Sequence, residues 1–326
     1  MTLSITIAIP TLNRHPQLAE TLHHLCRIDL SSVQEILIID QTDTFFDIKP
    51  WHARFSVPIR VIQPPVKGLC AARNIALQET TTDLILYLDD DVIPDCFLVE
   101  QHLKTYYEYP NAIGTAGAEK IAEESRAMRA KQRIRRWIAL ILRPYFSLDP
   151  YYSSFLDSTG YPVSLITRSG VFLCYFNHSE PCRVMTPRGC NMSFRCDSLR
   201  AIGGFDEGFI GNGRREESDM SLRLLKAFPG SEIWYNPKAT LIHLMSPTGG
   251  CRSDNREQWY RDLFHCETRF AYRHLKGLGK LIFRVYFFLR HLQIMVQYPV
   301  LFREFWSAKG GAIVTRLPQP SEIMER

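Results

Sequence analysis

The chain has 326 residues, of which 45% are hydrophobic and 22% are charged, and this composition is close to that of an average globular protein. It excludes a disordered chain, a collagen-like repeat and a small disulfide-stapled scaffold, and the length allows one large domain or two ordinary ones. The formal net charge is +5, but seven basic residues and no acidic residue fall within positions 125–143. The remainder is therefore slightly acidic, and we expect no nucleic-acid partner.

The first residues show neither the basic region nor the long apolar region of a secretion signal. The nine cysteines are odd in number and contain no C-x-x-C pair, so we expect reduced thiols, no structural zinc site and a cytoplasmic location. The sequence contains no uninterrupted apolar run of eighteen residues. The segment that comes nearest to one is 281–302. We therefore expect no transmembrane helix.

Apolar runs alternate with helical patterns through the first hundred residues. Strands are predicted at 5–9, 36–39, 59–62 and 84–88, and helices at 16–26 and 68–78. Runs that are apolar at every position are typical of strands buried on both faces, and intervening helices favour parallel pairing. The predicted fold class is α/β, with a mostly parallel central sheet flanked by helices.

The second half of the chain is less regular. A further strand is predicted at 114–118, and the segment 123–190 shows no sustained period apart from a basic helix near 124–143. The later pattern predicts a helix at 218–228, strands at 233–235 and 239–243, and two helices between 257 and 302. The basic helix and the apolar pattern at 281–302 are compatible with an anionic membrane surface or with packing, and a homodimer is also left open.

Polar side chains follow the predicted strands where an open α/β sheet binds its ligands. The most informative are the adjacent carboxylates of Asp89, Asp90 and Asp91, which would repel one another without a cation. Hard divalent ions such as Mn²⁺ or Mg²⁺ prefer oxygen ligands and commonly bridge carboxylates to a diphosphate. Most acidic triplets are solvated turns, but the position after a buried strand favours a metal site. His243 ends another strand and is a candidate ligand.

A second acidic cluster contains Glu216, Glu217 and Asp219. Acidic residues in a first helical turn are favoured by the helix dipole, and Ser218 is a candidate cap, so a structural role explains this cluster as well as a functional one. In the functional interpretation, one carboxylate is a base at the rim of the metal site. The chain has neither a G-x-G-x-x-G motif nor a P-loop, which disfavours dinucleotide dehydrogenases and P-loop enzymes.

Seven short segments, spread in order over residues 4–250, together resemble the family-2 inverting glycosyltransferases of the GT-A fold. They are Ile9–Arg14, Ile38–Asp40, Gly68–Asn74, Leu88–Asp91, Asn191–Arg195, Gly203–Glu207 and Glu216–Asp219. The resemblance implies a GT-A domain at 1–250, with a nucleotide-binding half at 1–118 and an acceptor half at 119–250, and a helical extension at 251–326. The implied reaction transfers a sugar from a nucleotide diphosphosugar, with UDP as the expected nucleotide, to a hydroxyl of a saccharide or lipid-linked acceptor.

The resemblance also implies roles for individual residues. Those implied to bind the donor are Pro10, Thr11, Asn13, Arg14, Asp40, Arg73, Asp89 and Asp90. Those implied to line the acceptor side are Asn191, Gly204, Phe205 and Asp206. Asp91, with Asp89 and His243, would hold Mn²⁺ or Mg²⁺, and Glu217 would be the catalytic base. The family usually has Asp where this chain has Glu217, so Glu216 and Asp219 stay open as alternatives for the base.

Two other functions compete with this interpretation. The departure at Glu217 leaves open a degenerate family member that only binds carbohydrate or lipid. A metal-dependent phosphohydrolase would use Asp89 and Asp91 as nucleophile and acid, but that class has its D-x-D after the first strand and a Thr or Val where this chain has Ile93. The sequence therefore favours the transferase, with the sugar and the acceptor unspecified.

Overall fold

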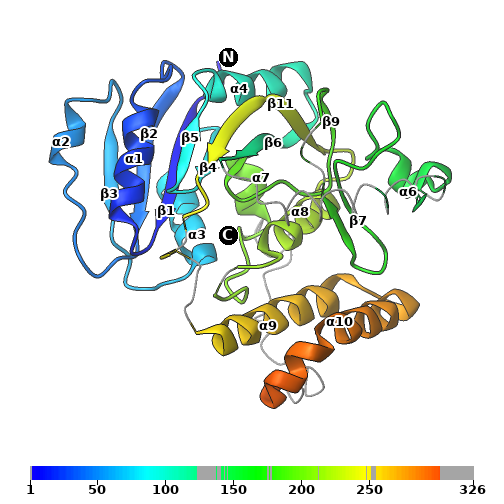
Figure 1. Cartoon of the computed structure of the whole chain (residues 1–326). Helices are drawn as coiled ribbons and strands as arrows, with labels where there is room; N and C mark the ends of the chain where they lie inside the picture. Colours follow the sequence, from blue (N-terminus) through cyan, green and yellow to red (C-terminus); the bar gives the residue numbers. More distant parts are fainter. Residues whose placement is uncertain are drawn as a thin grey trace.

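The structure is a computed structural model, and it describes residues 2–122, 137, 141, 142, 144, 146–174, 176, 178–211, 213–246, 248–250 and 255–301. Most of the predicted basic helix near 124–143 lies outside these residues. Within the described part the chain forms one central sheet, helices on both faces of it, and a C-terminal pair of helices (Figure 1).

The central sheet has nine strands, in the order β3-β2-β1-β4-β10-β6-β11-β5, with β9 pairing β11. Their bounds are β1 Ile5–Thr11, β2 Val33–Asp40, β3 Ile59–Ile62, β4 Leu84–Leu88, β5 Val92–Pro94, β6 Ala112–Ile121, β9 Cys182–Arg183, β10 Asn191–Arg195 and β11 Glu232–His243. A separate hairpin pairs β7, Ser164–Ile166, with β8, Phe172–Cys174. The predicted α/β class is confirmed.

Strands β3, β2, β1 and β4 are parallel, as predicted, and β6 is parallel to β11. The intervening β10 is antiparallel to both of its neighbours, and β11 is antiparallel to β5 and β9. The separate strands predicted at 233–235 and 239–243 form one continuous strand, β11, in which the register shifts between Asn236 and Thr240. The prediction split this strand because Pro237 and Lys238 interrupt its apolar pattern.

The helices are α1 His15–Leu25, α2 Lys49–His52, α3 Leu69–Glu79, α4 Leu98–Glu108, α6 Pro150–Ser153, α7 Cys196–Ala201, α8 Glu216–Ala227, α9 Arg256–His274 and α10 Gly277–Gln297. Those at α1, α3, α8, α9 and α10 were predicted to within a few residues, whereas α4 and α7 were not. The amphipathic α4 buries Leu98, Val99 and Leu103 on one side. This helix was not predicted, because the sequence analysis concentrated on polar residues at the ends of strands.

The sheet is buried on both faces because its strands alternate between two apolar cores. On β4, Leu84, Leu86 and Leu88 face one core, whereas Ile85 and Tyr87 face the other, and all five side chains are fully buried. This explains why the strand is apolar at every position. It also leaves Asp89–Asp91, the next residues, at the end of a rigid strand.

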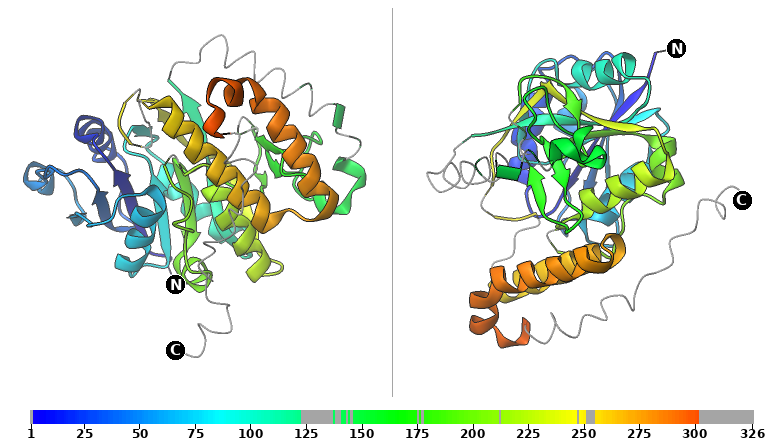
Figure 2. Two further views of the ribbon diagram at one scale, coloured as in Figure 1. Left: turned by 90° about the horizontal axis from the view of Figure 1, so that it is seen from below. Right: turned by 90° about the vertical axis from the view of Figure 1, so that its right-hand side faces the viewer.

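Helices α9 and α10 lie together on the α8 side of the molecule, away from β1–β3 (Figures 1 and 2). Helix α8 begins at Glu216 after Arg215, which has a left-handed φ of 73°. Ser218 therefore lies inside the first turn, and the expectation that it caps the helix is wrong. Among the described helices, including the 21-residue α10, none is long and apolar enough to cross a bilayer.

Candidate active site

A cavity of about 560 Å³ opens beyond the carboxyl ends of β1 and β4, and we call it the main cavity. Its walls come from the loop after β1, the carboxylates after β4, the end of β11, the segment 187–190 and the first turn of α8. A concave site of this size suits a small-molecule ligand. The main cavity therefore lies where an α/β sheet is expected to bind one.

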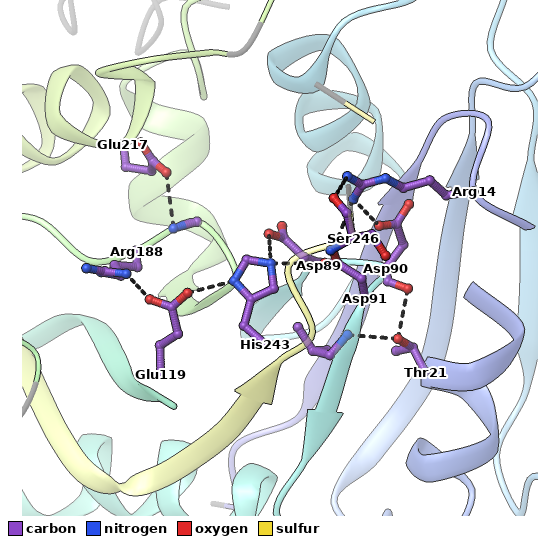
Figure 3. A network of polar contacts seen from close by, with 12 residues as sticks. Arg14, Thr21, Asp89, Asp90, Asp91, Glu119, Arg188, Glu217, His243 and Ser246 are labelled. Carbon is purple, nitrogen blue, oxygen red and sulfur yellow. Dashed lines mark hydrogen bonds and ion pairs between the residues drawn. The ribbon is translucent and has the colours of Figure 1, made fainter. Parts of the chain in front are cut away.

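His243, at the end of β11, lies between carboxylates on both sides (Figure 3). Its Nδ1 is 2.6 Å from Oε1 of Glu119, and its Nε2 is 3.0 Å from Oδ1 of Asp91. Glu119 also pairs with Arg188. Burial lowers the pKa of His243, but contacts with Asp91, Cys190 and Glu119 outweigh burial and raise this pKa above its ordinary value. Glu119 thus fixes the orientation of the imidazole, as a carboxylate does behind a ligating histidine.

The donor atoms around His243 fit a divalent cation. Ligand atoms of Asp89, Cys190 and His243 lie within 4.8 Å of one another. Oδ1 of Asp91 is buried beside them and accepts no well-aligned hydrogen bond from the described residues. Carboxylate and imidazole are ligands that Mn²⁺ accepts, and a thiol adds a softer donor. The predicted grouping of Asp89, Asp91 and His243 is therefore present in the structure.

The three aspartates after β4 differ in their surroundings. The side chain of Asp89 is 32% exposed, whereas those of Asp90 and Asp91 are buried. Burial raises the pKa of Asp90 to about 6, although Arg14 and Thr11 oppose it. Burial also acts to raise the pKa of Asp91, but His243 and the Ser246 amide bring it below its usual value. Repulsion within the triplet is reduced by shared partners, because Arg14 contacts Asp90 and Asp91 and His243 lies near Asp89 and Asp91.

Asp90 joins the loop after β1 to the end of β4. Its Oδ2 accepts a 2.7 Å hydrogen bond from Thr11, and its Oδ1 accepts a 3.0 Å bond from Arg14. Arg14 in turn donates to the carbonyls of Thr248 and Ser246. Thr11, Arg14 and Asp90 all line the main cavity beside Pro10, and both oxygens of Asp90 have protein partners. Their contact with a donor stays a prediction.

Two other predicted donor-binding residues, Asp40 and Asn13, are not among the residues that line the main cavity. Asp40 is fully buried, and its carboxylate contacts His15 Nε2 at 2.8 Å and accepts a bond from the Thr42 amide. Asn13 has a left-handed φ of 55°, and its amide donates to the Thr42 hydroxyl. Both residues hold the loops after β1 and β2 together. Their contact with a donor stays a prediction.

The adjacent residues Glu216 and Glu217 have different settings. Glu216 is buried and pairs with Arg73, which also donates a 3.2 Å hydrogen bond to the Gly189 carbonyl. Burial raises the pKa of Glu216 well above its usual value, although Arg73 opposes the shift. Glu217 lines the main cavity, and its Oε1 accepts a 3.1 Å bond from the Gly189 amide. Of these two candidate bases, only Glu217 has a carboxylate that is not in an ion pair within the described residues.

Gly189 separates Arg73 from Glu217. A methyl group at this position would lie 2.5 Å from Arg73 Nη2 and 2.6 Å from Glu217 Oε1. Both distances are shorter than van der Waals contact, so a larger residue would displace one of the two side chains. The buried Arg73–Glu216 pair and the Gly189 backbone therefore position Glu217 in the main cavity.

Asp219, the third candidate base, belongs to a set of ion pairs that fasten α9 to α8 and to the loop at 203–208. We call this set the α8–α9 seam. Asp219 is fully buried and contacts Arg223, Arg273 and His274 at 2.7–2.8 Å. It does not line the main cavity. Because both of its oxygens are engaged by largely buried partners, Asp219 acts on the fold in this structure.

Asp206, predicted to line the acceptor side, is also part of the seam. Its two oxygens accept bonds from Arg269 at 2.7 and 2.8 Å, and Arg273 lies 2.7 Å away. The remaining seam carboxylate, Glu267, contacts Arg214 at 2.7 Å and Arg215 at 3.0 Å. The seam thus consists of Asp206, Asp219 and Glu267 with their cationic partners.

The other predicted acceptor residues lie below the floor of the main cavity. Asn191 is fully buried and bonds to the carbonyls of Ala118 and Ala239 and to His102. Phe205 packs edge-on against Tyr87. None of Asn191, Gly204, Phe205 and Asp206 is among the residues that line the main cavity. Their acceptor role stays a prediction.

Sequence reasoning missed several residues of the main cavity. Glu119 directly follows the predicted strand at 114–118, so the strand-end rule applied to Asp89 would have found it. Arg188, Gly189 and Cys190 lie at the end of a segment without regular pattern, where no local signal was available. Trp259 comes from α9, which the sequence placed in a separate extension.

Comparison with known proteins decides the family. The profile described as "Glycosyl transferase family 2" matches residues 6–201, more than half of the chain. The chain belongs to this family. The residues matched include the carboxylates after β4 but end before Glu217 and His243. As a member of glycosyl transferase family 2, the protein is a glycosyltransferase with the GT-A fold, and the predicted family and enzyme class are confirmed.

Individual relatives are distant. A glucosyl-dolichyl phosphate glucuronosyltransferase of Haloferax volcanii is 19% identical over 249 residues, which are 74% of this chain and 69% of that protein. The mannosyltransferase PcManGT of Pyrobaculum calidifontis, solved with GDP-Man and Mn²⁺, has a TM-score of 0.54 and 15% identity, covering 100% of this chain and 79% of that one. GalNAc-T7, solved with UDP, GalNAc and Mn²⁺, has a TM-score of 0.56 and 14% identity, covering 91% of this chain. This chain covers 59% of the GalNAc-T7 chain, and the solved structures support the fold alone.

Proposed function

We propose that this family 2 enzyme is an inverting glycosyltransferase that uses a UDP-linked sugar and a hydroxyl acceptor. One observation carries the proposal: the carboxylate of Glu217 lines the same cavity as Asp89, Asp91 and His243, the candidate cation ligands, and the two aspartate carboxylates lie 3.8 and 3.0 Å from the His243 imidazole. A base and a diphosphate-binding site in one cavity are the two parts that a direct displacement needs. Arg14 and Arg188 also line this cavity and add positive charge for a nucleotide diphosphate.

Asp89, Asp91 and His243 would hold Mn²⁺ or Mg²⁺ in this enzyme. Such an ion supplies charge neutralisation for a departing diphosphate. The two solved structures that contain Mn²⁺ together with a nucleotide or a nucleotide sugar support this assignment by fold. Arg14, held by Asp90 and by two backbone carbonyls, provides a fixed positive charge 3.4 Å from Asp91.

The reaction is a single displacement at the anomeric carbon. Glu217 removes the proton from the acceptor hydroxyl, whose oxygen forms the new bond to the anomeric carbon. The bond from that carbon to the diphosphate oxygen breaks, and the nucleoside diphosphate leaves with the electron pair. Because one displacement occurs, the anomeric configuration inverts. The Arg73–Glu216 pair takes no part in proton transfer and holds the first turn of α8.

Glu217→Gln tests this mechanism. Removing the base should lower the transfer rate by about 10²–10⁴-fold while UDP and Mn²⁺ still stabilise the protein against heat. The matched control is Glu100→Gln, because Glu100 is exposed on α4 and lies outside the main cavity. Transfer is measured as UDP release with a panel of UDP-sugars and acceptors, and the anomeric proton coupling of the product reports inversion. Unchanged transfer by Glu217→Gln would exclude Glu217 as the base, and absence of transfer by the wild-type protein would favour a degenerate binding module.

We further propose that the acceptor side of the enzyme works at an anionic membrane surface. Helix α10 exposes an apolar stripe that repeats every three or four residues, formed by Leu278, Leu281, Val285, Leu289, Leu292 and Val296. The helix also carries Lys280, Arg284 and Arg290 and no acidic residue. Apolar and basic side chains on one exposed helix are typical of an interfacial helix. The dolichyl-linked substrate in the name of the Haloferax volcanii relative supports a lipid-linked acceptor.

Flotation with vesicles tests the membrane proposal. The full chain should float with phosphatidylglycerol vesicles, and the double variant Leu281→Ser, Leu289→Ser should float several-fold less. The matched control is Val66→Ser, which changes an exposed apolar side chain outside α10. Sedimentation of the wild-type chain as a dimer, together with no flotation, would instead assign the stripe to a homodimer contact.

A further inference from the structure

A second cavity of about 230 Å³ lies between α9, α10 and the residues that precede α8, and we call it the helical cavity. Its walls include Trp259, Tyr260, Tyr286, Arg290, Arg214 and Arg215. It has the volume for a single headgroup or monosaccharide and not for an oligosaccharide. Neither the family profile nor the seven sequence segments reach α9 and α10.

The helical cavity has an excess of positive charge. Three arginines line it, and Glu267 is the acidic residue among its lining groups. Glu267 divides its two oxygens between Arg214 and Arg215, so one carboxylate faces two guanidinium groups. The third, Arg290, is exposed and donates a 2.8 Å hydrogen bond to the hydroxyl of Tyr286. Among the described residues that line the helical cavity, positive groups therefore outnumber negative ones.

Arg215 adds a buried charge with unused hydrogen-bonding capacity. Its side chain is 8% exposed, its Nε bonds to Glu267, and its Nη2 bonds to the Gly170 carbonyl. Its Nη1 has no hydrogen-bond partner among the described residues. Burial of an arginine with an unpaired nitrogen costs free energy, and a nearby anion would offset that cost.

The helical cavity adjoins the main cavity, because Arg214, Arg215 and Trp259 line both. Arg214 and Arg215 also directly precede Glu216 and Glu217 in the chain. When the hydroxyl of an acceptor contacts Glu217, the adjoining part of the acceptor therefore lies next to Arg214 and Arg215. Guanidinium groups form paired hydrogen bonds with phosphate oxygens, and aromatic side chains supply apolar contact area for a sugar ring.

We propose that the helical cavity binds a phosphate group carried by the acceptor, with Arg290 and Arg214 as its contacts and Arg215 as a fixed positive charge behind them. This inference rests on the proposed function, because it places the phosphate beside the hydroxyl that reacts at Glu217. The same phosphate chemistry can come from a lipid phosphate or from a free sugar phosphate. Arg290 lies on α10, the helix that carries the exposed apolar stripe, so either source reaches the same arginine.

Binding of phosphate probes to the full chain tests the inference. The main cavity is first saturated with UDP and Mn²⁺, so that a phosphate probe is excluded from it. Farnesyl phosphate and farnesol, and glucose 1-phosphate and glucose, are then titrated by calorimetry. At least one phosphate should bind about tenfold or more tightly than its uncharged counterpart, and Arg290→Gln should weaken that binding about tenfold, as expected for a charge-assisted bond. The matched control Arg284→Gln removes a charge from the same helix but not from the helical cavity, and it should leave the affinity unchanged.

Each outcome separates the two sources or rejects the inference. Preferential binding of farnesyl phosphate assigns a lipid phosphate, and preferential binding of glucose 1-phosphate assigns a sugar phosphate. Equal binding of a phosphate and its uncharged counterpart would overturn the inference, as would equal effects of Arg290→Gln and Arg284→Gln. A missing thermal shift with UDP and Mn²⁺ would overturn the proposed function itself, whereas a normal shift without phosphate binding would overturn this inference alone.

Discussion

The main cavity and the α8–α9 seam are both built around buried carboxylates, but they use them differently. In the seam, Asp206, Asp219 and Glu267 have cations on both oxygens, and none of the three lines the main cavity. In the main cavity, Asp89 is partly exposed and Glu217 has a backbone amide as its partner. The difference shows that partners distant in sequence, and not the motif alone, decide whether an acidic residue of a family motif lines a cavity or joins a network of ion pairs.

The largest expected effect on stability comes from the seam. Asp219→Asn removes one charge that faces Arg223, Arg273 and His274, and it leaves the two arginines partly unpaired. We expect the free energy of unfolding to fall by about 3–5 kcal/mol, because removing one partner of a buried ion pair leaves an uncompensated charge in the interior. Urea unfolding measures it. The control is Asp197→Asn on α7, a fully exposed carboxylate that pairs with Arg200 and whose loss should leave stability nearly unchanged.

A loss as small as that of the control would mean that Asp219 is not a structural residue, and it would return Asp219 to the candidates for the base.

In the main cavity, His243→Gln should act on metal binding instead of stability. Losing the imidazole between Glu119 and Asp91 should weaken Mn²⁺ binding about 10–100-fold, the range seen when groups around a metal site are removed. Calorimetric titration of Mn²⁺ in the presence of UDP measures the change. His52→Gln, at an exposed position in α2, is the control. Unaltered Mn²⁺ affinity in His243→Gln would remove His243 from the cation site.

The pH dependence of stability should have opposite signs for the seam carboxylates and for Asp90 in the main cavity. Burial acts to raise the pKa values of Asp206, Asp219 and Glu267, but their Arg and His partners outweigh it and hold these pKa values below the ordinary ones. A depressed pKa in the folded state contributes stability that is present above the unfolded-state value and is lost as pH falls through the folded-state value. The seam should therefore weaken below about pH 4.

For Asp90 the pH dependence of stability has the reverse sign, because burial raises the pKa of its carboxyl group to about 6. The folded state then binds the proton more tightly than the unfolded state, so stability falls as pH rises from about 4 to 6. Asp90→Asn should flatten this interval, and Asp219→Asn should flatten the acid limb below it. The urea midpoints of the wild type and the two variants, measured from pH 3 to 7 in EDTA, report both effects. If the wild-type midpoint rose steadily from pH 4 to 6, in parallel with that of Asp90→Asn, the raised pKa of Asp90 would be contradicted. This is the smallest expected effect.

The strands that position the site were predictable because their residues face apolar cores on both sides. The limits of β3 and β4 agree with the predicted runs 59–62 and 84–88, and the strand-end rule led from β4 directly to Asp89–Asp91. Local chain order supplies all of that information. The first turn of α8 was likewise predictable as an acidic cluster.

The distribution of roles within the acidic cluster was not predictable, because partners that are distant in sequence decide it. Arg73 is 143 residues from Glu216, and Arg273 is 54 residues from Asp219. Arg188 and Cys190 were not predicted as cavity residues, because their segment has no periodic pattern. The helical cavity was not predicted, because the sequence placed α9 and α10 in a separate extension. Long-range ion pairs therefore assigned Glu217 to the main cavity and Asp219 to the seam.

Thermal unfolding with nucleotides tests the central claim most directly, namely that the carboxylates of the main cavity hold a metal–nucleotide complex. The wild-type chain is heated with UDP, dTDP or GDP, each with and without Mn²⁺, beside His243→Gln and Asp197→Asn. We expect UDP with Mn²⁺ to raise the melting temperature by about 3 °C or more, no comparable rise without Mn²⁺, a lost rise in His243→Gln and an intact one in Asp197→Asn. A rise that is equal with and without Mn²⁺, or no rise with any of the three nucleotides, would contradict the account.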